Sequence, residues 1–145
     1  MVCTATLFFK HFVTGFIGAK AKFVAGKRAP EDSGNDGKQN FGTFPADEKK
    51  DKKLEAAVIA EQRWNRITMN DLENIPIGLI TAWAAIASGG DANTIAYALI
   101  TFTVARVGHT IAYANALAAP RGLAYLVGSA TIFVLAGTGL SAVFR

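Results

Sequence analysis

The sequence predicts an all-α membrane protein, a bundle of four transmembrane helices in a single domain over residues 1–145. Apolar residues make up 51% of the chain and charged residues only 18%, whereas a soluble domain is nearer a quarter charged. The charge is also uneven, since only three Arg residues follow Arg66 and the sole acid beyond Glu73 is Asp91. Such a C-terminal half leaves almost no polar surface to face water, which favours a membrane protein.

The first predicted span covers about residues 2–19, which are apolar except for Lys10 and His11. A span needs about 20 mostly apolar residues. The segment lacks a cleavage-site pattern, so we expect a retained helix and not a signal peptide. A lysine in the middle of a span costs roughly 3 kcal/mol or more on a lipid-facing surface, so we expect Lys10 to face protein or to lie nearer the membrane surface than its position suggests.

A long extramembrane loop is predicted over about residues 20–60, which are rich in Gly, Pro, Asp, Asn and Lys. Residues 52–74 contain no Gly or Pro and predict a helix that leads directly into the second span, about 72–88. Pro76 removes one backbone donor and is expected to kink this span.

The third span is expected over about 94–113, after a short turn at 88–91, and the fourth over about 123–144, after a turn at 118–122. Most Lys and Arg residues lie between the first two spans, which predicts that this loop is cytoplasmic. The turn with Arg121 then lies on the same side, and both termini lie on the other.

Polar residues recur at helical spacing on two of these segments. Charged and polar side chains of these types are costly in lipid, so both helix faces are expected to look into the bundle or a cleft. Glu73 is expected to pair with Arg106. The two sets are Arg63, Arg66, Asn70 and Glu73, spaced 3, 4 and 3 apart, and Arg106, His109 and Tyr113, spaced 3 and 4 apart.

A structural polar network would explain these faces, and so would a binding site. The cations outnumber the acids there, which favours a site for an anion. Because Arg forms paired hydrogen bonds with carboxylates, a ligand with more than one carboxylate would suit it.

Several other sites are excluded. One cysteine and two separated histidines predict no metal site. The Lys-rich stretch at 49–53 is interleaved with acids and lacks alternating aromatic residues, so no nucleic-acid partner is expected. No phosphate-binding Gly loop or nucleophile elbow is present.

Three stretches form longer patterns: Arg63 and Arg66 followed by Asn-Asp-Leu-Glu-Asn-Ile-Pro at 70–76, Arg-x-x-His-Thr-x-x-Tyr at 106–113, and Pro-Glu-Asp at 30–32. Together they resemble the MAPEG superfamily, the membrane-associated proteins of eicosanoid and glutathione metabolism. The nearest branch looks like the microsomal glutathione transferase and prostaglandin E synthase group. The resemblance covers nearly the whole chain.

The resemblance implies a homotrimer with glutathione bound between neighbouring protomers and a lipophilic substrate arriving from the bilayer. It implies that Arg121 lies near the glutathione sulfur, where a cation would favour the thiolate, and that Tyr125 hydrogen-bonds near it. The residues implied to bind or line the glutathione site are Lys22, Arg66, Asn70, Glu73, Arg106, His109 and Tyr113.

Three functions fit the resemblance. The first is a membrane-bound glutathione transferase or peroxidase. The second is a glutathione-dependent isomerase of a prostaglandin-like endoperoxide; apolar Met69 and Gly122 argue against it, and Tyr125 mildly for it. The third is a non-catalytic MAPEG-fold subunit of a larger membrane assembly. All three are multi-pass membrane proteins, of the endoplasmic reticulum or mitochondrion if the source is eukaryotic.

Overall fold

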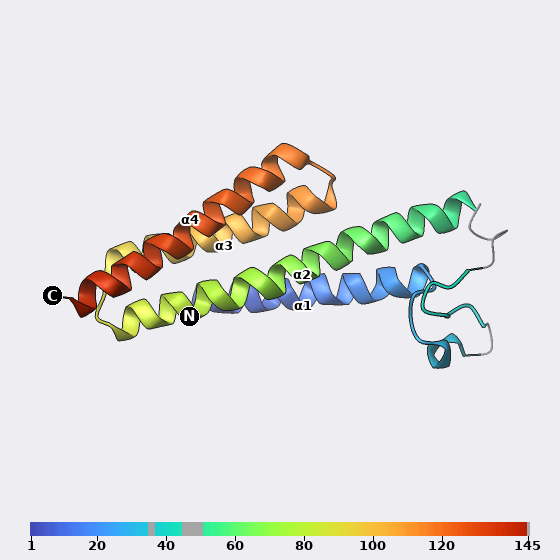
Figure 1. Cartoon of the computed structure of the whole chain (residues 1–145), viewed down its shortest axis with the longest axis horizontal. Helices are drawn as coiled ribbons and strands as arrows, with labels where there is room; N and C mark the ends of the chain where they lie inside the picture. Colours follow the sequence, from blue (N-terminus) through green and yellow to red (C-terminus); the bar gives the residue numbers. More distant parts are fainter. Residues whose placement is uncertain (35–36, 45–50, 145) are drawn as a thin grey trace. The chain divides into compact units, whose positions relative to one another are not determined.

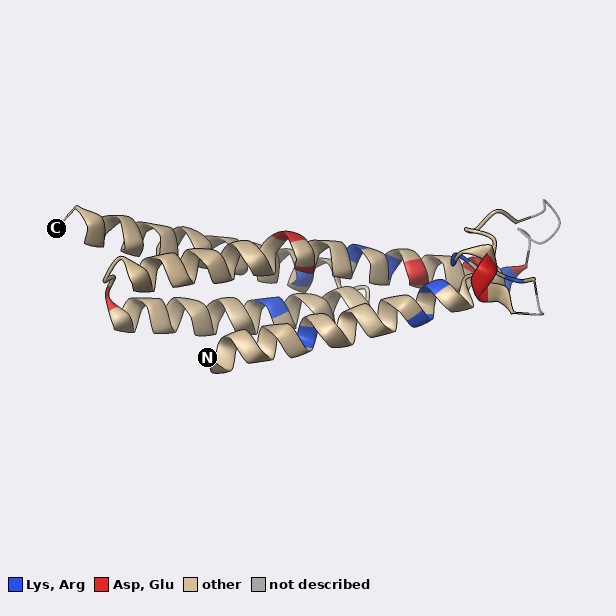
Figure 2. Cartoon of the chain, turned by 90° about the horizontal axis from the view of Figure 1, so that it is seen from below, with Lys and Arg blue, Asp and Glu red and all other residues tan. Residues whose placement is uncertain are grey.

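The computed structural model describes residues 1–34, 37–44 and 51–144, and its regular elements there are all helices (Figure 1). These are α1 (Val2–Val24), the short 3-10 helix η1 (Pro30–Ser33), α2 (Lys52–Ala87), α3 (Ala92–Ala114) and α4 (Ala118–Val143). The predicted all-α fold with four long helices in this order is confirmed. Charged residues are scarce along α3 and α4, as Figure 2 shows.

Three of these helices, α1, α3 and α4, are long and apolar enough to cross a membrane. The fourth, α2, has 36 residues and continues through Pro76 to Ala87, but polar residues at 70–74 interrupt its apolar part. The predicted helix from Lys52 into this segment is confirmed, and the span over 72–88 stays a prediction. Helix α1 continues to Val24 and α2 begins at Lys52, and the extramembrane placement of residues 20–60 stays a prediction.

The first three long helices end in the same way, with one residue in the left-handed backbone conformation. Gly26 (φ +63°) follows α1, Gly89 (φ +74°) follows α2 and Ala116 (φ +58°) follows α3. At each end the next N–H donates to a carbonyl five residues earlier, for example Leu117 N to Ala112 O at 2.9 Å. This pattern satisfies carbonyls that the helix leaves without partners.

The predicted turn at 118–122 is wrong. The chain turns at residues 115–117, and Pro120 and Gly122 lie inside α4. Proline is tolerated in the first turn of a helix, because the N–H it lacks would have no intrahelical acceptor there. The residue that ends α3 is Ala116, which sequence inspection does not mark as a terminator.

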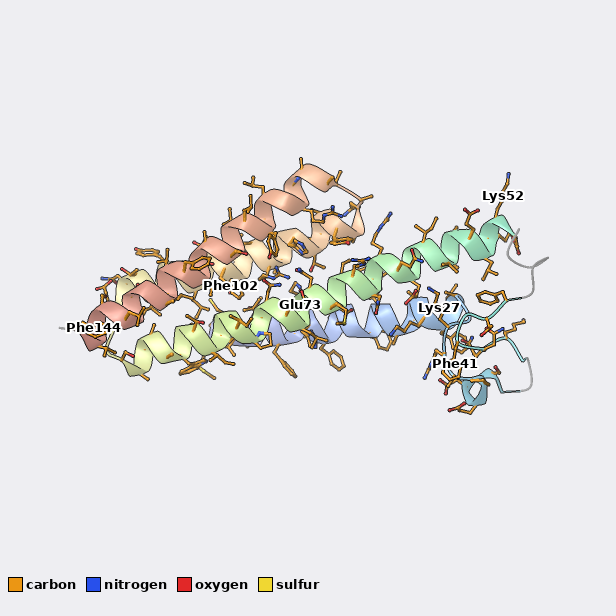
Figure 3. All side chains as sticks on the ribbon, in the orientation of Figure 1. Lys27, Phe41, Lys52, Glu73, Phe102 and Phe144 are labelled. Carbon is orange, nitrogen blue, oxygen red and sulfur yellow. The ribbon has the colours of Figure 1, made fainter. Side chains whose placement is uncertain are left out.

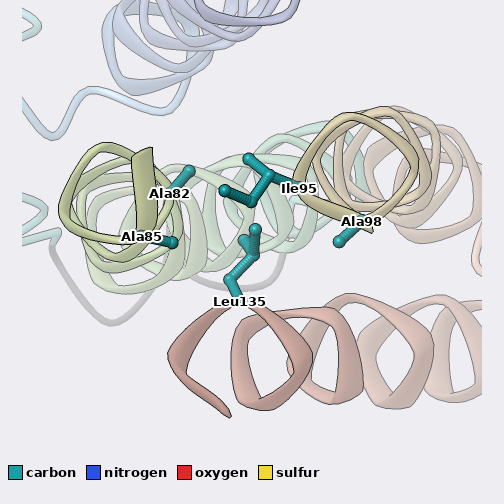
Figure 4. Packing of buried hydrophobic residues seen from close by; sticks show 5 residues of the cluster. All are labelled: Ala82, Ala85, Ile95, Ala98 and Leu135. Atoms are coloured by element: carbon teal, nitrogen blue, oxygen red, sulfur yellow. The ribbon is translucent and has the colours of Figure 1, made fainter. Parts of the chain in front are cut away.

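The described chain divides into two compact units, residues 1–11 with 69–145 and residues 12–68. In the first unit, α3 and α4 pack along each other as a hairpin. Figure 4 shows side chains from α2, α3 and α4 meeting in an apolar layer. This layer consists of Ala82, Ala85, Ile95, Ala98 and Leu135, and all five residues are buried.

The second unit holds a folded loop between α1 and α2. Buried Gln39 donates to Phe23 O and accepts from Arg28 N, which joins the loop to the end of α1. Lys27, labelled in Figure 3, forms a 2.5 Å ion pair with Glu61 of α2. Gly26 is required here because a Cβ would lie 2.8 Å from Lys38 O.

Candidate functional site

The first unit contains a layer of buried charge, which we call the charged layer: Lys10, Asp71 and Arg106. These residues come from α1, α2 and α3, and they are 9%, 0% and 1% exposed. Lys10 Nζ donates to both oxygens of Asp71, at 2.5 and 2.6 Å, and Arg106 Nη2 donates to Oδ1 at 3.1 Å. The expectation that Lys10 faces protein is confirmed. One carboxylate thus serves two buried cations.

The expected pairing of Glu73 with Arg106 is wrong. Glu73 is exposed, and among the described residues it forms no ion pair. The acid that meets Arg106 is Asp71, two positions earlier in α2. Two residues correspond to about 200° around a helix, so Asp71 and Glu73 lie on nearly opposite faces and only one of them can face α3.

Arg106 also holds the side chain of Asn70. Its Nη2 donates to Asn70 Oδ1 at 2.5 Å and reaches the Asn70 backbone oxygen at 3.4 Å. The guanidinium therefore contacts two consecutive residues of α2. This contact connects the charged layer to the motif at 70–76.

Three buried polar atoms of α3 lack a hydrogen-bond partner in the described part of the chain. They are Arg106 Nε, His109 Nδ1 and Thr110 Oγ1. Positions 106, 109 and 110 lie on one face of a helix. A buried polar atom without a partner costs free energy, so a ligand, water or second chain that supplied partners would be stabilised here.

An aromatic cluster lies next to these atoms in the α3–α4 hairpin. The His109 ring meets Tyr113 edge-on, with centroids 5.7 Å apart, and the Tyr125 ring lies 6.5 Å from His109. Arg121, in the first turn of α4, places its guanidinium carbon 4.5 Å from the centroid of the Tyr113 ring. That distance is within the range of a cation–π interaction.

Six of the expected site residues lie in the first unit, in two groups of neighbours, one around Arg106 and one around His109. They are Asn70, Arg106, His109, Tyr113, Arg121 and Tyr125. Lys22 and Arg66 belong to the second unit, where both are exposed. Sequence reasoning missed the roles of Asp71 and Thr110. Both lie within the recognised motifs, and a helical-wheel comparison of Asp71 with Glu73 could have shown that only one faces inward.

The donor set of this region points to an anionic ligand. Guanidinium groups only donate hydrogen bonds, and the nearby acid is already bound by two cations. In the part of the chain that the structure describes, no three His, Cys, Asp or Glu residues are grouped so as to hold a metal ion. The arrangement can therefore bind and polarise an anion through hydrogen bonds and charge.

Comparison with known proteins gives two results. None of the curated proteins compared with the chain matches it. A scan against models of protein families matches residues 1–141 to the MAPEG family. Because this match covers nearly the whole sequence, the chain belongs to the MAPEG family.

Proposed function

We propose that this protein binds glutathione and activates its thiol for attack on lipophilic molecules, as a membrane-bound glutathione transferase or peroxidase. Membership of the MAPEG family and three helices long and apolar enough to cross a membrane support a glutathione-related role in a membrane. The observation that carries the proposal is the group of buried polar atoms without partners on α3, beside an excess of cations. Glutathione has two carboxylates, which accept hydrogen bonds from guanidinium groups.

Arg121 is the group proposed to activate the thiol. It lies in the first turn of α4, where the backbone N–H groups favour an anion, and it is half-buried. A cation beside the sulfur stabilises the thiolate, which is the nucleophile. In conjugation, the thiol proton leaves, a sulfur–carbon bond forms, and a halide departs or an enal takes up the proton. In peroxide reduction, two glutathione molecules become the disulfide while a hydroperoxide becomes an alcohol and water.

Titration of the detergent-solubilised full chain with glutathione tests this proposal. Bound thiolate is read from its ultraviolet absorbance against pH. We expect Arg121→Ala to bind glutathione nearly as well as wild type, to form less thiolate, and to conjugate a model electrophile about 100-fold more slowly. Lys53→Ala removes an exposed charge from the second unit and is the matched control. It should leave the thiolate fraction and the conjugation rate unchanged.

Two results would contradict the assignment. Equal thiolate fractions in wild type and Arg121→Ala would show that Arg121 is not the activating group. A wild type that binds no glutathione would exclude the enzyme and favour the non-catalytic subunit of a larger assembly.

A homotrimer belongs to this proposal. Glu73 is exposed on α2 within the predicted span over 72–88, and a carboxylate facing lipid is costly. A second copy of the chain that covered Glu73 would remove that cost. Light scattering of the solubilised protein should give three times the 15.3 kDa chain mass after subtraction of detergent. A monomer mass would contradict the trimer.

A further inference from the structure

We infer that Lys10 is a positioning residue for the glutathione site, acting through Asp71 and Arg106 on the side-chain amide of Asn70. The inference rests on the proposed function. It gives a role to a cation of α1 that touches neither Asn70 nor the unpartnered atoms of α3.

The first step is the competition for Asp71. Guanidinium and carboxylate groups prefer a bidentate arrangement, with two parallel hydrogen bonds. Arg106 instead divides its Nη2 between two acceptors, since this nitrogen donates to Oδ1 of Asp71, at 3.1 Å, and to Oδ1 of Asn70. Lys10 lies across both carboxylate oxygens, at 2.5 and 2.6 Å. Lys10 thus occupies the position that a second hydrogen bond from Arg106 would need.

The second step is the contact that this arrangement leaves to Arg106. Its Nη2 donates to Asn70 Oδ1 at 2.5 Å, in addition to its longer contact with Asp71. If Lys10 were neutral, Asp71 would attract the whole guanidinium, and the bidentate pair would form at the expense of Asn70. The charge of Lys10 therefore keeps Arg106 on the amide.

The third step is the orientation of that amide. Arg106 can only donate, so the Asn70 oxygen must face it and the NH₂ group must point away. In the described chain, no residue accepts a hydrogen bond from Asn70 Nδ2. Asn70 therefore offers donors to a ligand, which assigns it to a carboxylate or carbonyl oxygen of glutathione and not to the ammonium group.

The test compares neutral substitutions of two lysines of α1. Lys10→Met removes the charge but keeps the length of the side chain, and Lys20→Met does the same at an exposed position. We expect Lys10→Met to bind glutathione about 10-fold more weakly, as when a supporting residue behind a ligand contact is lost. Lys20→Met should bind like wild type, and Lys10→Arg, which keeps a cation against Asp71, should recover part of the affinity.

A double-mutant cycle identifies the route of the effect. If Lys10 acts through the amide, Lys10→Met should change the affinity little in an Asn70→Ala background. Melting temperatures of the variants in detergent report folding separately. Equal affinities of Lys10→Met and wild type, or fully additive effects in the cycle, would overturn the relay and leave the proposed function standing. Absence of glutathione binding by wild type would instead overturn both.

Discussion

The apolar layer and the charged layer lie in the same unit and share helices α2 and α3, yet they are built differently. The apolar layer spreads its contacts over five residues, four of which are Ala or Leu. The charged layer depends on a single carboxylate, Asp71, which contacts two cations from two other helices. In a membrane, lipid tails are as apolar as leucine, so apolar contacts gain only through close packing. The charged layer therefore specifies which helix faces meet, and the apolar layer determines how closely they approach.

The largest effect is expected where the charged layer loses its only acid. Asp71→Ala leaves Lys10 and Arg106 buried without their carboxylate, and we expect the free energy of unfolding in detergent to fall by about 4 kcal/mol. Glu55→Ala, which removes an exposed acid from the first turn of the same helix, is the control, with a change within about 1 kcal/mol. If both variants lost the same free energy of unfolding, the ion pairs of Asp71 would not be the cause of its effect.

A smaller loss is expected for the most buried side chain of the apolar layer. Leu135→Ala should lower the free energy of unfolding by about 2 kcal/mol, because the cavity it leaves is only partly closed by its neighbours. Leu140, on the same helix, is 60% exposed and serves as control. Thermal unfolding in one detergent should separate the two variants. If Leu140→Ala lost as much stability as Leu135→Ala, burial within the chain would not be the cause of the loss.

The smallest effect concerns two glycines of α4. A Cβ at Gly139 would lie 3.1 Å from Ala85 Cα, whereas a Cβ at Gly137 would meet nothing within 4 Å. Both Gly→Ala changes gain the same helix propensity. We expect Gly139→Ala to be less stable than Gly137→Ala by about 1 kcal/mol in the same unfolding assay. Equal stabilities would show that α2 and α4 can separate without cost.

The fold could be predicted largely from sequence, because hydropathy and helix breakers act locally. Gly26 and Gly89 end helices as glycines commonly do. The position of the last turn could not be predicted in this way, because Ala116 takes the left-handed conformation and Pro120 lies in the first turn of a helix instead of ending one. Residue type alone does not indicate that an alanine ends one helix or that a proline lies inside the next.

The candidate site could be predicted in its residue types and less well in its pairings. The spacing of Arg106, His109 and Tyr113 placed them on one face, and His109 and Tyr113 do meet. The partner of Arg106 could not be read from spacing, because it depends on which face of α2 turns toward α3. The contact between Lys10 and Asp71 joins residues 61 positions apart, and only tertiary structure brings them together.

That separation has a consequence for how the protein is made. When α1 leaves the ribosome, Lys10 lacks its ion-pair partner, since Asp71 is synthesised 61 residues later. A lone lysine in the middle of a helix adds roughly 3 kcal/mol to the cost of membrane insertion. We therefore expect α1 to enter the bilayer stably only together with α2, as a helical pair. A nascent chain that stops before Asp71 should leave its first helix at the membrane surface.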